Sequence, residues 1–437
     1  MTDTTNVTDN GSSNLNSNEI DERLVTADGV PLKQKLAQTT RRLRWRAFVL
    51  TIPLVVFLIV SFVVPIGQML FRSVHNTAGT DVAPNFAAEI QKWDGQGLPS
   101  EEVFALFAKD IQASHKRREI GKTPGKLGTR VNYEFPGSLS LIKSAPRKFK
   151  KIKEGPYKEA ILALDKRWSN PTLWRTLKRV SRDYSPSFYY AAVDMKYDAD
   201  EKLVAADDIY QIYVSNFWKT LRLSAIITFL CFLLAFPVAY LLSTLPLATS
   251  NLLMILVLLP FWTSLLVRTT AWIAILQSKG IINNILVFIG IISDENRVQL
   301  IYNQTGTIFA MVHILLPFMI LPLYSVMKTI PPSYMRAARS MGATPFTAFR
   351  RVYFPQTLPG IAAGTLLVFI LAIGYYITPA LVGGADGVLI SNLIANHIQK
   401  TLNWSLGAAL GTILLVTVMV LYWLYNKLVG IDKLSFG

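Results

Sequence analysis

Residues 223–267 read LSAIITFLCFLLAFPVAYLLSTLPLATSNLLMILVLLPFWTSLLV and contain no Asp, Glu, Lys or Arg. A helix needs roughly 20 apolar residues to cross the hydrocarbon core of a bilayer, so this stretch holds most of two crossings. Ser243, Thr244, Pro246 and Asn251 are turn formers near its middle, where they divide it in two. The stretch therefore predicts a membrane protein built from helices.

Four further segments are free of charged residues over a comparable length. They lie between Arg46 and Arg72, Arg297 and Lys328, Arg351 and Asp386, and Lys400 and Lys427. With 51% apolar and only 16% charged residues, the 437-residue chain is too apolar for an ordinary soluble domain. We predict transmembrane helices near residues 47–71, 215–243, 251–276, 305–327, 358–382 and 406–427. Residues 280–292 are too few to cross, so they are predicted to lie at the interface or to enter the membrane partway.

The basic residues predict the orientation. With the N-terminus inside, the inner segments that flank the spans carry thirteen basic residues: Lys33, Lys35, Arg41, Arg42, Arg44, Arg46, Lys328, Arg336, Arg339, Arg350, Arg351, Lys427 and Lys433. The short outer segments carry only Lys279, Arg297 and Lys400. Cytoplasmic loops are enriched in Lys and Arg, so both termini are predicted in the cytoplasm. Topology and attraction to anionic lipid then account for much of the net charge of +16, without nucleic acid.

The pattern divides the chain into four segments. They are a disordered and basic cytoplasmic tail, the first span, an inserted periplasmic domain and a five-helix core, at residues 1–46, 47–72, 73–213 and 214–437. The opening residues are polar, and the first apolar run has full spanning length with no cleavage site, so we expect no signal peptide. Cys231 is the single cysteine, which rules out a disulfide framework or a Cys-rich metal site.

The inserted domain is predicted to be small and mixed α/β, with more helix than sheet. Within residues 101–114, one helical face holds Phe104, Phe107, Ala108 and Ile111. Asn170 and Pro171 are typical of a helix start, and residues 187–193 fit a strand. We interpret the basic stretch 143–158 as a solvated loop, the alternative being a site for an acidic ligand. Location alone suggests that the domain docks a solute-binding protein.

The loop at residues 329–360, between the fourth and fifth spans, is the most informative segment. Pro331 and Pro332 end the fourth span and can start a short helix. Offsets of 0, 3, 4 and 7 place four residues on one face of that helix: Tyr334, Ala337, Ala338 and Met341. Gly342 is then expected to end it.

A second short helix follows the glycine. Thr344 is a good N-cap and Pro345 suits the first helical position, so the helix should run through Phe349 and end before Pro355. The small residues of the first helix permit close approach to a groove on another protein. We therefore interpret the loop as a cytoplasmic lever that passes a partner's motion to the spans.

This loop resembles that of ABC importer permeases, which has a Glu-Ala-Ala, Gly, Ile-x-Leu-Pro pattern. The matching residues here are Arg336, Ala337, Ala338, Gly342, Val352, Phe354 and Pro355. The chain departs from the pattern at Arg336, where the family has Glu, so we expect a compensating acidic residue on the partner. Residues 261–264 (FWTS), 268–272 (RTTAW), 316–324 (LPFMILPLY) and 378–384 (TPALVGG) are similar to the spermidine/putrescine class of these permeases.

The resemblance implies an all-α permease of the type I importer fold in the cell inner membrane. It also implies two copies of an ATPase that bind ATP and Mg, a second permease subunit and a periplasmic solute-binding protein. The coupling residues it implies are Tyr334, Arg336, Ala337, Ala338, Met341, Gly342 and Pro345.

Polar and aromatic residues within spans are candidates for a translocation pathway. We select Trp262, Thr263, Arg268, Trp272, His313, Tyr375 and Tyr376. Arg268 could stack on Trp272 in a pathway wall, or snorkel to the outer surface beside an aromatic-belt Trp. His313 lies four residues before Pro317, which favours a hinge over a solute ligand. The two tyrosines suit either a cationic solute or packing at a kink.

The solute stays open at this point. A cationic polyamine favours carboxylates, yet no Asp or Glu occurs in any predicted span. Either the partner permease supplies them, or the binding protein selects the solute, or the solute is amino-acid-like, an opine, a phosphonate or a metal chelate. The usual catalytic and phosphate-binding motifs are missing, so we predict neither enzyme activity nor a cofactor or metal site in this chain. A membrane sensor or secondary transporter is the other alternative.

Overall fold

The computed structural model describes residues 32–117, 119, 121–152, 155–198 and 200–429. The described residues separate into two units, with the boundary between Gln68 and Met69. The first contains α2 (Leu32–Leu58), a π turn η1 (Ile59–Val63) and the start of α3 (Val64–Val74).

The predicted unstructured tail extends to residue 46, but in the structure helix α2 already begins at Leu32. Residues 33–46 contain no Gly or Pro and many good helix formers, which explains the difference. Residues 1–31, also predicted disordered, lie outside the described residues.

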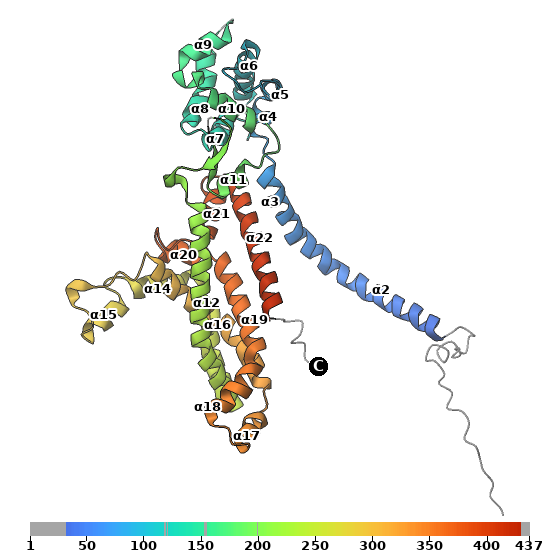
Figure 1. Ribbon diagram of the computed structural model, residues 1–437, viewed down its shortest axis with the longest axis vertical. Coiled ribbons are helices and arrows are strands. Elements are labelled where there is room, and N and C mark those ends of the chain that lie inside the picture. Colours follow the sequence, from blue (N-terminus) through green and yellow to red (C-terminus); the bar gives the residue numbers. More distant parts are fainter. Residues whose placement is uncertain (1–31, 118, 120, 153–154, 199, 430–437) are drawn as a thin grey trace, which may run out of the picture. The chain divides into compact units, whose positions relative to one another are not determined.

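The inserted domain consists of short helices around one apolar core (Figure 1). Its elements are α4 (Ala78–Val82), α5 (Pro84–Ile90), α6 (Glu101–Arg117), α7 (Pro124–Asn132), α8 (Ser138–Phe149), α9 (Tyr157–Leu164), η2 (Lys166–Ser169), α10 (Pro171–Val180), α11 (Ser187–Ala192), β1 (Met195–Tyr197), β2 (Leu203–Ala205) and η3 (Asp208–Tyr210). The two strands are antiparallel, with Met195 opposite Ala205. The predicted mixed domain with more helix than sheet is confirmed.

Aromatic side chains fill the centre of this core. The fully buried ones include Phe104, Phe107, Phe149, Trp168 and Trp174. The ring centroids of Phe104 and Trp174 lie 4.2 Å apart, and those of Phe107 and Trp168 lie 5.5 Å apart. Trp174 Nε1 donates to the carbonyl oxygen of Trp168 at 2.8 Å, so the one polar atom of that ring is satisfied. The predicted apolar face of α6 is buried, and Thr172 N donates to the Asn170 cap at 2.9 Å, as expected.

Two local predictions in the inserted domain are wrong. Residues 187–193 form helix α11 and not a strand, because Phe188 and Ala192 have helical spacing and both pack into one apolar cluster. The basic stretch at 143–158 is partly helix, because α8 extends to Phe149. Ala145 and Phe149 face the core there, while the basic residue Lys143 is exposed on the other side. The helical period of the apolar residues outweighs the high charge.

An ion-pair cluster joins two helices of the inserted domain. Glu134 accepts from Arg130 Nη2 and from Arg179 Nε, both at 2.7 Å. Burial raises the pKa of Glu134, but the two guanidinium groups outweigh burial and hold the pKa below its ordinary value. The cluster therefore stabilises the domain while the carboxyl is ionised.

The second part of unit two is a helical core. Its elements are α12 (Tyr213–Thr244), α13 (Leu247–Trp262), α14 (Leu265–Leu276), α15 (Ile281–Phe288), η4 (Asp294–Asn296), α16 (Gln304–Thr329), α17 (Pro332–Ser340), α18 (Pro345–Ala348), a π turn η5 (Phe349–Tyr353), α19 (Phe354–Gly374), α20 (Ile377–Val382), α21 (Ile390–Gln399) and α22 (Trp404–Val429). Helix α16 packs on both α12 and α19. Gly364 permits the second contact, because a Cβ there would lie 2.7 Å from Met319 Sδ.

The described residues include six helical segments long and apolar enough to cross a membrane: Thr39–Val74, Tyr213–Thr244, Leu265–Phe288, Gln304–Thr329, Pro345–Gly374 and Trp404–Lys427. The expected number of spans is confirmed, but the third was placed wrongly. Residues 251–276 are not one helix, because α13 ends at Trp262 and α14 begins at Leu265. The predicted fifth span also divides, since α19 ends at Gly374 and α20 follows. The predicted short helix at 280–292 is present as α15.

Truncating Phe107 should destabilise the inserted domain. We expect Phe107→Ala in the full chain to cost about 3–5 kcal/mol, because the side chain is fully buried among aromatic rings. The urea dependence of proteolysis within residues 75–212 measures this. Lys109→Ala, an exposed change on the same helix, is the control. Equal protease resistance of the two variants would contradict the assigned core.

Glu134 should make the stability of this domain depend on pH. Its folded pKa is depressed, so its contribution is complete above the unfolded value of about 4.3 and disappears as pH falls through the folded pKa. Glu134→Gln should therefore be much less stable than wild type at pH 7 and close to it at low pH. Thermal unfolding at both pH values, followed by tryptophan fluorescence, measures the gap. An equal difference in thermal stability between wild type and Glu134→Gln at both pH values would rule out the assigned ion pairs.

Candidate functional site

The loop between α16 and α19 has the predicted helix, glycine and helix. Helix α17 begins with Pro332 and ends at Ser340, and Gly342 follows with φ 90°. Such a positive φ suits glycine and strains other residues. Thr344 then caps α18, because its Oγ1 accepts from Thr347 N at 3.2 Å, and Pro345 takes the first helical position. These local rules fix a sharp bend between two short helices.

The bend exposes apolar side chains to solvent. Met341 is 82% exposed, Phe346 is 72% exposed and Tyr334 is 50% exposed, while Ala337 is also exposed. Ala338 is only 4% exposed, so it packs inward and does not share the outer surface as its helical offset predicted. Phe346 is a residue that sequence reasoning missed, although an aromatic residue directly after Pro345 in a polar loop is a usable signal. We call Tyr334, Ala337, Met341 and Phe346 the exposed loop surface.

Aromatic rings attach this loop to α12. Phe349 stacks on Tyr353 with centroids 5.6 Å apart, and Tyr240 of α12 meets both rings edge-on at 6.0 and 5.3 Å. Phe236, one turn earlier on α12, lies 5.8 Å from Phe354. The sequence signal for this aromatic cluster is a pair of four-residue spacings, Phe236 with Tyr240 and Phe349 with Tyr353. The cluster joins the bend to the end of α12 that is remote from the inserted domain.

The second short helix does not end before Pro355 as predicted. α18 continues through the π turn η5 into α19, and Pro355 lies in the first turn of α19. The first turn of a helix tolerates proline, because its amides need no partner within the helix. Arg336 is exposed, and no ion pair found among the described residues includes it. Its charge is therefore open to a partner.

Arg268 does not stack on Trp272. Its guanidinium donates to the carbonyl oxygens of Pro260 and Thr263, the latter at 3.0 Å, and to Thr263 Oγ1 at 3.3 Å. It thus satisfies carbonyls at the end of α13, next to the break that sequence reasoning missed. The sequence signal for this break is Pro260, which removes one helical amide, together with a basic residue in the first turn of the next helix.

Trp272 contacts His313 across two helices. Trp272 Nε1 donates to His313 Nδ1 at 3.1 Å, and the two rings lie edge-on at 5.4 Å. The assigned hydrogen bond requires an unprotonated Nδ1. Of the seven pathway candidates, two pairs are thus in contact, Arg268 with Thr263 and Trp272 with His313. Trp262 is 73% exposed, and no ring contact of it with another candidate is found.

Tyr375 and Tyr376 lie at the break between α19 and α20. The carbonyl oxygen of Tyr375 accepts from Ser391 Oγ at 2.6 Å, and that of Tyr376 accepts from Asn392 Nδ2 at 2.7 Å. The side chains that compensate the broken helix therefore come from α21. Thr269 and Thr378, with hydroxyl oxygens 3.5 Å apart, join α14 to α20 beside the same break.

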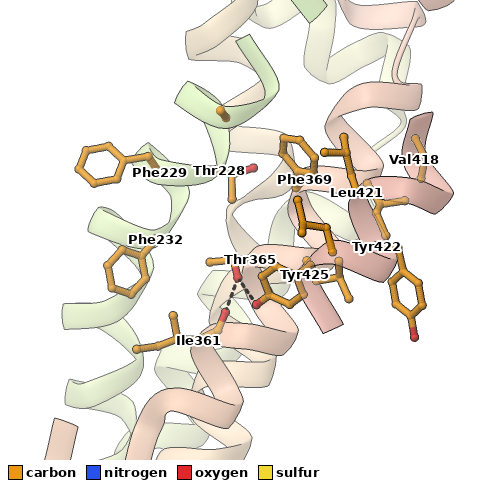
Figure 2. A pocket seen from close by; sticks show the side chains of 14 residues that line it. Thr228, Phe229, Phe232, Ile361, Thr365, Phe369, Val418, Leu421, Tyr422 and Tyr425 are labelled. Atoms are coloured by element: carbon orange, nitrogen blue, oxygen red, sulfur yellow. Dashed lines mark hydrogen bonds between the residues drawn. The ribbon is translucent and has the colours of Figure 1, made fainter. Parts of the chain in front are cut away.

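An apolar groove runs between α12, α19 and α22 (Figure 2). It has a volume of about 460 Å³ and is lined by residues that include Phe229, Phe232 and Phe369. Among its polar groups, Thr365 Oγ1 donates to the Ile361 carbonyl at 2.8 Å and lies 3.0 Å from Tyr425 OH. Tyr425 OH also donates to the Ala362 carbonyl at 2.7 Å. None of the seven pathway candidates lines this groove.

A second cavity, of about 650 Å³, lies between the inserted domain and the start of α12. Four carboxylates line it, from Glu134, Asp194, Asp198 and Asp207. Each already has a partner: Glu134 binds arginines, Asp207 binds Lys196 at 2.7 Å, and the other two accept backbone amides. Asp194 caps α12 in this way, which fixes the domain to the first turn of that helix.

Comparison with known proteins identifies the family to which this chain belongs. The family described as "Binding-protein-dependent transport system inner membrane component" matches residues 229–429. The spermidine/putrescine transport system permease protein PotB of Haemophilus influenzae is 37% identical over 222 residues, covering 50% of this chain and 77% of that protein. PotB of Escherichia coli is 34% identical over 222 residues, covering 50% and 80%. The inner membrane ABC transporter permease protein YdcU of Escherichia coli is 30% identical, covering 48% and 70%. The chain therefore belongs to the family of binding-protein-dependent ABC importer permeases, which are multi-pass inner membrane proteins.

Proposed function

We propose that this permease moves polyamines such as spermidine and putrescine into the cell, driven by a separate ATPase. The observation that carries the proposal is the 34–37% identity with PotB permeases over more than three quarters of their length. The matched family region, residues 229–429, includes the coupling loop and all seven pathway candidates. ATP and Mg bind to the partner ATPase, and this chain supplies the membrane passage.

The exposed loop surface is the docking site for that ATPase. Met341 and Phe346 are large apolar side chains held in water by a rigid bend, and burying them in a partner groove is favourable. Arg336 beside them complements an acidic residue of the ATPase. With two permease subunits, each presenting one such loop, the assembly binds two ATPase copies and receives solute from a periplasmic binding protein.

The orientation follows from charge and from the position of the loop. Basic residues concentrate on the segments predicted to be inside, which supports a cytoplasmic position for both termini and the loop. The aromatic cluster joins the loop to one end of α12, while Asp194 joins the inserted domain to the other. The 32-residue α12 is about 48 Å long, enough to cross the membrane between them. The inserted domain therefore faces the periplasm, where a binding protein can dock.

Motion passes from the loop to the helix breaks. A displacement of α17 moves Phe349 and Tyr353, which are packed on α12, and moves α19 through the continuous π turn. At its other end α19 breaks at Tyr375, near the contact of α14 with α20. Thr263, Arg268, Trp272, His313, Tyr375 and Tyr376 form the pathway wall, with Trp262 beside the break in α13. Breaks in spanning helices are suitable hinges for opening a passage.

Selection of a cationic solute is expected to take place outside this wall. The six candidate spans contain no Asp or Glu among their residues, and Arg268 adds a positive charge. The binding protein and the partner permease therefore supply the carboxylates. Aromatic faces such as Trp272 and Tyr375 permit passage of an amine without binding it tightly.

Charging the exposed loop surface should abolish ATPase binding. We expect Met341→Arg to weaken co-purification of the ATPase at least about tenfold, because an apolar anchor is replaced by a charge at a desolvated contact. Insertion and the amount of permease should not change, since the side chain is exposed. Arg339→Gln, an exposed change two residues earlier in the last turn of α17, is the control. Co-purification of the ATPase with Met341→Arg at the level of the wild type would show that the loop is not its docking site.

Uptake assays with radiolabelled compounds test whether the solute is a polyamine. Cells that express the permease with its ATPase, second permease and binding protein should accumulate radiolabelled spermidine or putrescine, and cells without this permease should not. Excess unlabelled polyamine should compete, whereas an opine, a phosphonate or a metal chelate should not. Uptake of one of those compounds, with none of either polyamine, would reject the substrate proposal and retain the permease.

A further inference from the structure

A basic cavity lies where the inserted domain meets the ends of two spans. It has a volume of about 600 Å³ and is bordered by the last residues of α3, the start of α4, helix α7 and the start of α22. Its four basic residues are Arg72, His75, Lys126 and Arg130. Of the described residues that line it, none is Asp or Glu.

The positive charge in this cavity is only partly compensated. Arg130 is neutralised by Glu134 at 2.7 Å, and Lys126 lies 3.5 Å from Asp81 in a loose pair. Arg72 lies over the Trp404 ring, 5.5 Å from its centroid, and is not a member of any ion pair found among the described residues. A net positive charge therefore faces the cavity.

Asn403 supplies an independent reason to expect a ligand. Its Oδ1 caps α22 by accepting from Leu406 N at 3.3 Å, which leaves Nδ2 as the remaining donor of the amide. Nδ2 is buried, and no hydrogen-bond partner for it is found among the described residues. Asn403 is 8% exposed and borders both this cavity and the cavity lined by carboxylates. A buried donor without an acceptor is unfavourable, so an acceptor that reaches Nδ2 would be stabilised there.

The N-terminus of α22 adds to this preference for an anion. Helix α22 runs for 26 residues, and the amides of its first turn present partial positive charge at Trp404 and Ser405. The cavity thus combines cationic side chains, a helix N-terminus and an unused amide donor. Groups with several acceptor oxygens, above all phosphate, match such a set of donors.

We propose that this cavity binds a phosphate group, and that a phospholipid headgroup of the leaflet nearest the inserted domain supplies it. Arg72 and Trp404 lie at the ends of two candidate spans, the level at which headgroups and aromatic belts occur. Trp404 is half exposed there. The phosphate bridges α7 of the inserted domain to α3 and α22, so bound lipid holds the domain against the membrane-spanning core.

Calorimetric titration of the purified, delipidated full chain in detergent tests this site. The probes are dihexanoyl phosphatidylglycerol, inorganic phosphate and, as a phosphate-free lipid, dihexanoylglycerol. Arg72→Gln with Lys126→Gln removes two cations from the cavity. Asn403→Asp keeps the oxygen that caps α22 and replaces the unused donor with an acceptor, so it tests the site without removing the cap.

We expect wild type to bind the phospholipid but not dihexanoylglycerol, and both cavity variants to bind it about tenfold more weakly or worse. The control, Lys116→Gln with Arg117→Gln, removes two exposed charges of α6 outside the cavity and should bind like wild type. Binding of inorganic phosphate alone, with the same dependence on the variants, would keep the site and reject lipid as its source. Equal binding by all four proteins, or no binding of either phosphate probe, would overturn the proposal.

Discussion

Inside a bilayer every backbone N–H and C=O must find a partner within the protein, and this constraint governs where the core helices can break. Two of the breaks near the candidate spans, at Thr263 and at Tyr375, are compensated by side chains. Arg268 donates to carbonyls at the end of α13, and residues of α21 donate to Tyr375 and Tyr376. The breaks are therefore stabilised by specific hydrogen bonds. Helices can tilt at these positions without exposing unbonded backbone groups.

The proposed coupling loop and the helix breaks are joined by a continuous set of packed elements. The bend at Gly342 exposes a rigid apolar surface on one side, and the aromatic cluster on the other side attaches it to α12. Since α19 continues from the loop to the break at Tyr375, a movement at the surface reaches the opposite end of the core. The inserted domain is fixed at the other end of α12 by Asp194, which caps that helix.

Much of this architecture can be predicted from the sequence, because its causes are local. Long charge-free segments predict the spans, and Thr344 with Pro345 predicts the start of α18. The break after Trp262 was missed, because it depends on whether Arg268 reaches back to the Pro260 carbonyl. Ala338 was placed on the outer face by its helical offset, but packing of the loop against the core buries it. Such contacts between segments are set by the tertiary structure, which periodicity does not contain.

The proposed function requires the bend around Gly342 to be a cytoplasmic contact with a separate ATPase. The most direct measurement is crosslinking from Ala337→Cys, in a Cys231→Ser background, in sided membrane vesicles that contain the complete transporter. With an added oxidant and a cysteine introduced into the facing groove of the ATPase, we expect a disulfide between the two thiols. We also expect an impermeant maleimide to label Ala337→Cys from the cytoplasmic side only. Labelling from the periplasmic side alone, or the absence of any ATPase crosslink while the complex is intact, would contradict it.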